Sequence, residues 1–440
     1  MGARLTFTGG IHPYDGKDLS KDKPIRDIKP KGELVYPLSQ HIGAPAKAIV
    51  NKGDKVLRGQ MIAEAGGFVS APIYATVSGS VKAIEKRRIT VGDKVDCIVI
   101  ENDNEYNEVD YGEENDLSAL SKKEIIEKIQ KAGVVGMGGA GFPTHVKLSP
   151  KEPEKIDYVI ANCAECEPYL TSDYRRMIEE PEKVIGGLKC VLELFDNAKG
   201  ILAVEDNKPD CIKILKDLTR DEPRILVAAL KTKYPQGAER ALIYATTGRE
   251  INSDMLPADA GCVVDNVDTL VAINAAVRYN IPLMERIVTV TGDAIKDPCN
   301  FRVMIGTNYK ELIDEAGGFV SEPEKVINGG PMMGFALFDL DVPTTKTASA
   351  LLCLTKDQVS SSKEGPCINC SRCVEVCPGR VIPARLADFA AHGDKENFRK
   401  WNGMECCECG CCSFVCPAKR QLTQQIKSMR KMILADRKKK

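Results

Sequence analysis

Ten of the eighteen cysteines of this chain lie between Cys367 and Cys416. They include two runs that repeat the spacing Cys-x2-Cys-x2-Cys-x3-Cys-Pro. The runs are Cys367, Cys370, Cys373 and Cys377, and then Cys406, Cys409, Cys412 and Cys416. A tight loop places three thiolates on one face of a [4Fe–4S] cluster, and the fourth cysteine reaches a neighbouring cluster. The spacing therefore predicts two such clusters and a function in single-electron transfer.

The same spacing predicts which cysteines share a cluster. We assign Cys367, Cys370, Cys373 and Cys416 to one cluster, and Cys406, Cys409, Cys412 and Cys377 to the other. Zinc is the alternative, because Cys-x2-Cys pairs also bind zinc. A zinc site does not need a third cysteine at x2 and a fourth at x3 before proline, twice over. Cys407 and Cys411 fall outside the repeat and are interpreted as spectators.

Composition narrows the class of protein. There are 61 basic and 62 acidic residues, so nothing global favours nucleic acid. The N-terminus has no apolar signal-like stretch, so dense cysteines favour metal over disulfides. No stretch approaches about 18 uninterrupted apolar residues, so we expect membrane association only through a partner.

Two loops further upstream have the residue types of a nucleotide site. The run Gly136–Lys147 holds Gly138, Gly139 and Gly141, and dense glycines let backbone N–H groups approach a phosphate. A tight structural loop is the alternative. The second loop, Asn162–Arg175, follows a predicted strand, where open α/β sheets bind ligands. It contains Cys163 and Cys166, which we interpret as packing residues rather than a redox or metal pair.

The elements that must position these groups follow a recognisable order. Residues 31–90 alternate apolar and polar residues between tight turns, which predicts β structure. The acidic stretch 103–122 predicts a linker, with Ser121 and Glu124 as a capping box for the next helix. Strand-like and helix-like runs alternate over 134–285, which predicts a parallel α/β sheet. Residues 286–340 predict a small α+β unit, and 341–365 a polar linker.

These motifs carry a resemblance to known families. GMGGAGFPTHVK followed by NCAECEPYLTSDYR, with later segments at 237–242 and 264–270, is similar to the flavin- and NADH-binding module of the respiratory complex I flavoprotein subunit. The β phrases of 31–90 look like biotinyl and lipoyl carriers, but AGGFVSAP has no lysine to modify, which favours a scaffold. With the opening Phe7–Pro13 and the paired cysteine runs, the order resembles the C subunit of the Rnf complex over about residues 5–425.

The resemblance implies a multidomain α/β and α+β fold. Its expected parts are a barrel-sandwich-hybrid domain with linker, a Rossmann-like parallel α/β domain for FMN and NADH, a β-grasp (SLBB) domain, a ferredoxin-like helical domain with two [4Fe–4S] clusters, and a basic tail. The expected boundaries are 1–115, 116–285, 286–345, 355–425 and 426–440.

The resemblance also implies which residues bind the cofactors. Those expected at the phosphate of non-covalent FMN are Gly138, Gly139, Ala140, Gly141 and Lys147, with Asn266 and Thr269 closing that side. Asn162 and Glu165 are expected at the flavin, and Phe142, Glu167 and Glu239 at NAD(H). Ala164 and Ala238 replace an aspartate and a glutamate of the complex I pattern. No acid or base side chain is expected to be catalytic, because the cofactors supply the chemistry.

The activity implied is that of an NAD:ferredoxin oxidoreductase, in a peripheral subunit on the cytoplasmic face of the cell membrane. Its expected partners are the membrane subunits and the ferredoxin-type B subunit, with NADH as substrate and ferredoxin reached indirectly. A soluble flavin and iron–sulfur reductase of the cobalamin-reductase type is one alternative. An electron-transfer adaptor that lacks NADH binding is another.

Overall fold

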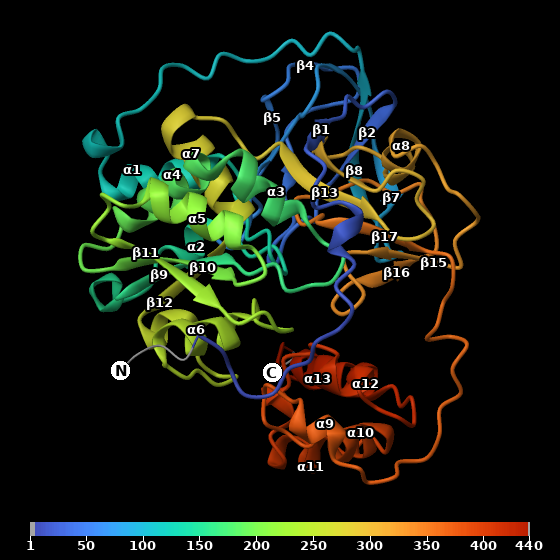
Figure 1. The fold of residues 1–440 in the computed structure, drawn as a ribbon. Helices are drawn as coiled ribbons and strands as arrows, with labels where there is room; N and C mark the ends of the chain where they lie inside the picture. The colour runs from blue at the N-terminus through green and yellow to red at the C-terminus, as the bar shows by residue number, and fades with distance from the viewer. Residues whose placement is uncertain (1–4, 439–440) are drawn as a thin grey trace.

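The computed structural model describes residues 5–438 (Figure 1). The first group of elements is formed mainly by short strands. The elements are η1 (Lys17–Leu19), β1 (Ile25–Asp27), β2 (Glu33–Pro37), β3 (Lys47–Ala48), β4 (Lys55–Val56), β5 (Met61–Glu64), β6 (Ile73–Tyr74), β7 (Gly79–Arg88) and β8 (Lys94–Asn102). Two sheets, of order β2-β8-β7-β4 and β3-β5-β6, enclose a core that includes Leu34, Tyr36 and Ile62. We call this unit the barrel. Alternate residues of β2 are buried, as the apolar pattern predicts.

The second group of elements forms a parallel α/β unit. It contains η2 (Leu117–Ala119), α1 (Lys122–Lys131), α2 (Thr144–Lys147), η3 (Pro153–Lys155), β9 (Tyr158–Cys163), α3 (Ser172–Glu179), α4 (Pro181–Leu192), β10 (Lys199–Glu205), α5 (Pro209–Leu218), β11 (Ile225–Leu230), α6 (Glu239–Thr247), η4 (Pro257–Ala260), β12 (Cys262–Asn266) and α7 (Val267–Tyr279). The sheet order is β11-β10-β9-β12, and all three pairings are parallel. The capping box of Ser121 and Glu124 starts α1, so both predictions are confirmed.

The third group builds a six-stranded sheet beside the barrel. Its elements are β13 (Glu285–Thr291), β14 (Cys299–Met304), α8 (Tyr309–Glu315), β15 (Lys325–Asn328), β16 (Phe335–Leu337) and β17 (Ala350–Leu354). The strand order is β1-β14-β13-β17-β15-β16. The predicted polar linker 341–365 is therefore wrong over 350–354, because β17 is buried between β13 and β15. The N-terminal strand β1 also joins this sheet, next to β14.

The last group is helical and carries the cysteine runs. It contains α9 (Arg372–Glu375), α10 (Pro383–Ala391), α11 (Lys395–Lys400), η5 (Gly403–Glu405), α12 (Cys411–Phe414) and α13 (Leu422–Lys438). Each run has left-handed residues at corresponding positions: Asn369 and Glu408, then Ser371 and Gly410. The two runs thus fold as a repeat. Among residues 5–438, none of the helices combines the length and apolar character that a membrane crossing needs.

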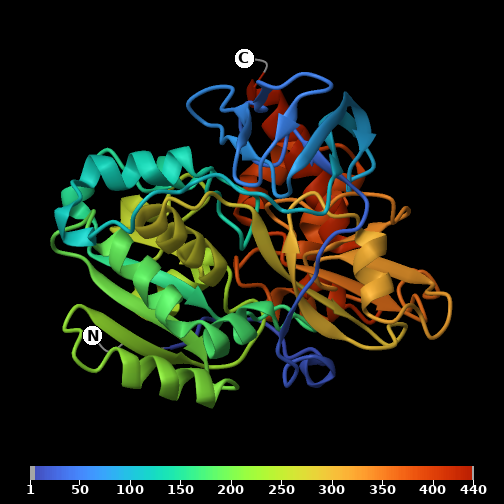
Figure 2. The same cartoon turned by 90° about the horizontal axis from the view of Figure 1, so that it is seen from above.

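Figures 1 and 2 show how these groups lie in space. The α/β unit stands on one side, with the barrel and the six-stranded sheet on the other. The helical cysteine region lies below them in Figure 1, reached by a long connection after β17. The N-terminal segment 5–28 runs from the α/β unit past the cysteine region to the six-stranded sheet. It therefore contacts three of the four groups.

Candidate functional site

A large pocket extends from the carboxyl edge of the parallel sheet along its edge strand β12. Its volume is about 1350 Å³, and its walls include the glycine loop, the ends of β9 and β12, and the start of α6. Asn162 near the end of β9 stands in register with Asn266 at the end of β12, so both amides reach the same wall. This edge is where parallel α/β sheets bind ligands.

The glycine loop is fixed at its base and open at its tip. The backbone N–H of Gly136 donates to the carbonyl of Phe142 at 2.8 Å, which closes the loop. The N–H of Met137 donates to Oγ1 of Thr269 on α7 at 3.0 Å. Gly141 has a φ of 71°, which favours glycine, and the Gly139 Cβ position has no atom within 4 Å. The loop is thus held in shape while its tip stays accessible.

Charged groups lie at the inner wall of the pocket. Lys147 Nζ donates to the Val264 carbonyl at 2.8 Å and to Oδ1 of Asp265 at 3.0 Å. The other carboxylate oxygen of Asp265 is buried without a hydrogen-bond partner among the described residues. Desolvation by the pocket walls raises the pKa of Glu239, and Lys147 opposes that shift. Lys147 and Glu239 therefore give the pocket one basic and one acidic side chain, whereas Asp265 lies buried behind Lys147.

The pocket gathers most of the residues that the sequence places at FMN and NAD(H). Those that line it are Gly138, Gly139, Ala140, Gly141, Phe142, Lys147, Asn162, Glu239, Asn266 and Thr269. The structure does not bring Glu165 or Glu167 to it. Their side chains turn to other parts of the chain.

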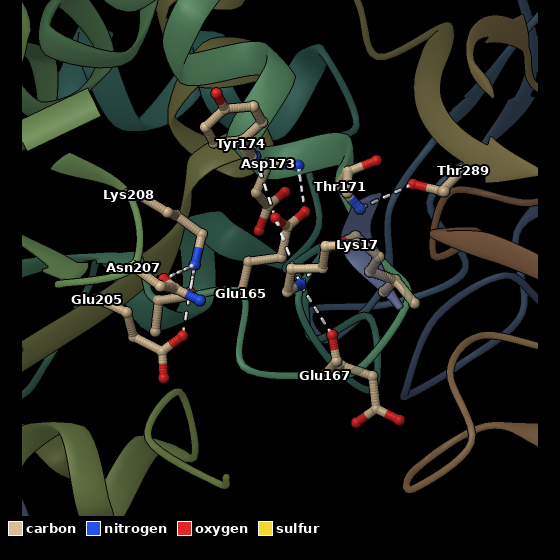
Figure 3. Close-up of polar contacts among 12 residues, drawn as sticks. Lys17, Glu165, Glu167, Thr171, Asp173, Tyr174, Glu205, Asn207, Lys208 and Thr289 are labelled. Atoms are coloured by element: carbon tan, nitrogen blue, oxygen red, sulfur yellow. Dashed lines mark hydrogen bonds and ion pairs between the residues drawn. The ribbon is translucent and has the colours of Figure 1, made fainter. Parts of the chain in front are cut away.

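Glu165 belongs to a buried network of charges instead (Figure 3). Its carboxylate accepts hydrogen bonds from the backbone N–H of Asp173 at 2.7 Å and of Tyr174 at 3.3 Å. Lys17 of the N-terminal segment lies 3.8 Å away and also donates to the carbonyl of Glu167 at 3.0 Å. Burial raises the pKa of Glu165, although Lys17 lowers it. In the structure Glu165 thus holds its own loop, and its contact with the flavin stays a prediction.

Glu167 connects the α/β unit to the six-stranded sheet. Its Oε1 accepts from the backbone N–H of Met332 at 2.7 Å and of Met333 at 3.1 Å. These methionines lie in the loop between β15 and β16. Glu167 therefore holds an interdomain loop rather than facing the pocket. A carboxylate motif in sequence cannot show this, because the partner lies about 165 residues away.

Several pocket residues lie outside the motifs that the sequence displays. The outer wall contains Lys151, Lys155 and Arg249, which are basic. Arg249 is held by an ion pair to Asp157 at 2.5 Å. The charged run 149–155, with Lys151 and Lys155, is a local signal that could have drawn attention to this wall. The acidic residues Glu152, Asp157, Glu250 and Asp259 line the same part of the pocket, so these basic side chains lie among carboxylates.

Electrostatic contacts link cysteines of the two runs. Burial raises the pKa of Cys406 and of Cys412 to about 12, and Cys377 from the other run adds to both shifts. Burial also raises the pKa of Cys373, with contributions from Cys367 and Cys370. Within residues 5–438, no group of three or more potential ligands is close enough for a single metal ion. A four-iron cluster holds its cysteines farther apart than a single ion does.

The remaining cysteines of interest do not pair with one another. Cys163 is buried in the core of the α/β unit, whereas Cys166 packs towards Tyr234 and Cys409. Both are free thiols, and burial raises the pKa of each. Cys411 is fully buried and its Sγ lies 4.0 Å from the carbonyl of Tyr234. Cys166 and Cys411 thus line the contact between the α/β unit and the cysteine region.

Three known domain families match this chain in sequence. Residues 5–105 match the RnfC barrel sandwich hybrid domain, residues 129–275 the Nuo51 FMN-binding domain, and residues 287–336 the SLBB domain. The predicted fold class is confirmed by these matches and by the observed sheets. The exact domain boundaries and the individual ligands stay predictions.

Curated relatives are similar to this chain in sequence over most of its length, and a solved structure is similar to it in fold over 71% of it. The C subunit of the Na⁺-translocating ferredoxin:NAD⁺ oxidoreductase complex of Acetobacterium woodii is 45% identical over 439 residues, which are 99% of this chain and 98% of the relative. The C subunit of the proton-translocating complex of Clostridium ljungdahlii is 47% identical over 87% of this chain and 84% of the relative. The NAD⁺-reducing [NiFe]-hydrogenase in its air-oxidized state is similar in fold, with a TM-score of 0.50 at 19% identity over 71% of this chain and 66% of that one. The chain therefore belongs to the family of the C subunits of the Rnf-type ferredoxin:NAD⁺ oxidoreductase complexes.

Proposed function

We propose that this chain exchanges electrons between NAD(H) and two [4Fe–4S] clusters, through FMN, as a subunit of an ion-translocating ferredoxin:NAD⁺ oxidoreductase complex. The observation that carries the proposal is one continuous loop. Gly237, Ala238 and Glu239 line the pocket, and Tyr234 at the start of the same loop contacts the loop of Cys409. Nucleotide pocket and cysteine runs are therefore adjacent.

The pocket fits FMN. Gly138, Gly139 and Ala140 are exposed in the pocket lining, and no atom lies within 4 Å of the Gly139 Cβ position, so backbone N–H groups at this tip are accessible to a phosphate. Lys147 lines the same pocket and supplies a positive charge nearby, held in place by Asp265 behind it. When bound, FMN supplies two-electron exchange with the nicotinamide and one-electron exchange with the clusters.

The outer part of the pocket fits a dinucleotide. Phe142 in the glycine loop and Glu239 at the start of α6 line the pocket together with Lys155 and Arg249. We assign the adenine nucleotide phosphates to these basic residues, and the nicotinamide to the side of Phe142. Glu167 stays a predicted NAD(H) residue, although its Oε1 accepts from Met332 and Met333 and it does not line the pocket.

The cysteine region fits two four-iron clusters. The sets are Cys367, Cys370, Cys373 and Cys416, and Cys377, Cys406, Cys409 and Cys412. The influence of Cys377 on Cys406 and Cys412 supports a set drawn from both runs. The order of domains, with the barrel first, favours the Rnf complex over a cobalamin-type reductase. We place the chain on the cytoplasmic face of the membrane, held there by the membrane subunits and the ferredoxin-type B subunit.

Anaerobic purification of the full chain, with iron, sulfide and flavin analysis, tests this proposal. We expect about eight irons per chain, from two four-iron clusters, together with one FMN. NADH should then bleach the flavin absorbance in a stopped-flow measurement. Zinc, or iron far below this amount, would overturn the cluster assignment. Bound FMN that NADH fails to bleach would favour the adaptor that lacks NADH binding.

A further inference from the structure

The loop 234–239 has two ends that face different cofactor sites. At one end Gly237, Ala238 and Glu239 form part of the pocket wall. At the other end Tyr234 is 2% exposed and packs with Cys409 and Cys411. Only two residues separate Tyr234 from the pocket wall. Tyr234 therefore lies close to the pocket in sequence while its side chain contacts the cysteine region.

Tyr234 is fixed to the second cysteine run by a direct hydrogen bond. Its hydroxyl donates to the backbone carbonyl of Cys409 at 2.7 Å. Its own backbone pairs with Ile11 of the N-terminal segment, with the N–H donating at 3.0 Å. The tyrosine is thus held from behind while its side chain reaches the cysteine loop.

Cys166 fills the space between the pocket wall and this contact. Its Sγ accepts a hydrogen bond from the N–H of Gly237 at 3.2 Å, directly behind the pocket wall. The same thiol packs with Tyr234 and Cys409. Gly237, Cys166 and Tyr234 therefore form a short, packed connection between the pocket wall and the loop of Cys409.

Two further contacts hold neighbours of the same cluster set. Glu405, next to Cys406, pairs with Arg240 at 2.8 Å and accepts from the N–H of Ser253 at 3.0 Å. Gly10 donates its N–H to the carbonyl of Val376, next to Cys377, at 2.8 Å. Cys367 and Cys370 of the other set are exposed. The contacts thus turn one set towards the pocket and the other away.

We propose that Tyr234, with Cys166 beside it, is a positioning residue that holds the Cys409 loop against the pocket, so that the cluster of Cys377, Cys406, Cys409 and Cys412 exchanges electrons directly with the flavin. This inference rests on the proposed function. For electron flow from NADH, the reduced flavin would lose one electron and that cluster would gain it. No bond to Tyr234 or Cys166 forms or breaks.

The test uses Tyr234→Phe in the full chain, purified anaerobically with both cofactors. Removing the hydroxyl frees the Cys409 loop but keeps the aromatic ring. Flavin reduction by NADH should keep its rate, and cluster reduction should slow roughly 10-fold, because a small misplacement of reacting groups is costly. The EPR signal of one reduced cluster should change. A Cys367→Ser variant, which perturbs the other set, identifies the signal that must stay unchanged.

Tyr309→Phe is the matched control. Tyr309 is also buried and donates one hydrogen bond at 2.7 Å, to Oδ1 of Asn328 in the six-stranded sheet. It should leave both the cluster phase and the EPR signals as in the unmodified chain. Cys166→Ala should slow the cluster phase as Tyr234→Phe does, and Cys163→Ala should not.

Two results separate this inference from the proposed function. If the unmodified chain shows no flavin or cluster phase, the proposed function fails. If it shows both phases, and Tyr234→Phe with full cofactor content keeps the cluster rate and both EPR signals, only the positioning role is overturned. A change confined to the signal of the Cys367 set would overturn it as well.

Discussion

The α/β unit and the cysteine region differ in what holds them together. The α/β unit has a large apolar core on one face of its sheet, a second core on the other, and a buried network of paired charges. The cysteine region has a small core around Leu386, Phe398 and Ile426, and several cysteines at its surface. A small core rarely stabilises a domain alone, and metal binding then becomes part of folding. We therefore expect the first region to form its site before the cofactor binds, and the second to need the proposed clusters in order to fold.

Loss of one predicted cluster ligand gives the largest expected effect. Cys406→Ser should remove about four irons per chain, the content of one cluster, and should expose residues 366–421 to limited proteolysis. The thermal transition of the α/β unit should persist, because its core does not include this region. Iron analysis and mass spectrometry of the proteolytic fragments measure both.

Cys407→Ala is the matched control for that variant. Cys407 is adjacent in sequence but falls outside the repeated spacing. It should keep its iron and its resistance to protease. If Cys407→Ala lost iron and Cys406→Ser kept it, the predicted ligand sets would be wrong.

The cysteine spacing and the α/β rhythm could be predicted because both are local. The spacing of Cys406, Cys409 and Cys412 fixes the cluster loop within a few residues. The strand β17 was missed because its five apolar residues stand between two polar runs, and its partners β13 and β15 precede it. The pairing of β1 with β14 joins residues far apart in the chain, which no local pattern encodes.

In the candidate site, too, the positions that depend on local sequence could be predicted, and those that depend on distant contacts could not. The glycine loop and its neighbours line the pocket, because strand ends of a parallel sheet meet at one edge. Glu165 and Glu167 do not, because their partners are Lys17 and Met332, which come from other domains. Sequence motifs thus predict the loop, whereas the orientation of its side chains depends on contacts with segments distant in the chain.

The next largest effect is expected for the buried network of charges around Glu165. Lys17→Met should lower the free energy of unfolding by about 3–5 kcal/mol, because it leaves Glu165 buried without its partner. Chemical denaturation, followed by circular dichroism, measures the change. Lys21→Met, on the exposed Lys21, should change it little. Equal effects of the two variants would show that the buried pair contributes nothing special.

A smaller effect is expected at the tip of the glycine loop. Gly139→Ala should leave the stability of the chain unchanged, since a Cβ there meets no atom within 4 Å. It should weaken FMN binding roughly 10-fold, or about 1.4 kcal/mol, because the methyl group occupies space beside the phosphate. Isothermal titration of the FMN-free chain measures this. Gly67→Ala in the barrel is the control, and FMN affinity equal in both variants would place the phosphate elsewhere.

The last effect concerns the junction between the barrel and the α/β unit, and it is spread over a wide pH range. Lys346 is buried, and its Nζ donates to the carbonyls of Pro72 in the barrel and Gly133 in the α/β unit, at 2.6 and 2.8 Å. Burial lowers its pKa to about 7. Between that value and its ordinary pKa of 10.5, the unfolded chain binds a proton that the folded chain does not. The free energy of unfolding should therefore rise with pH over this window, by at most about 1.4 kcal/mol per pH unit.

Denaturation at pH 7, 8 and 9 measures this slope, and Lys346→Met isolates the contribution of the lysine. The variant should flatten the pH dependence, although it leaves two buried carbonyls without their donor and so lowers stability at every pH. Lys310→Met on the exposed Lys310 should keep the slope. An unchanged slope in Lys346→Met would mean that the lysine stays charged in the folded chain, and the junction would then hold a buried cation by its two carbonyls alone.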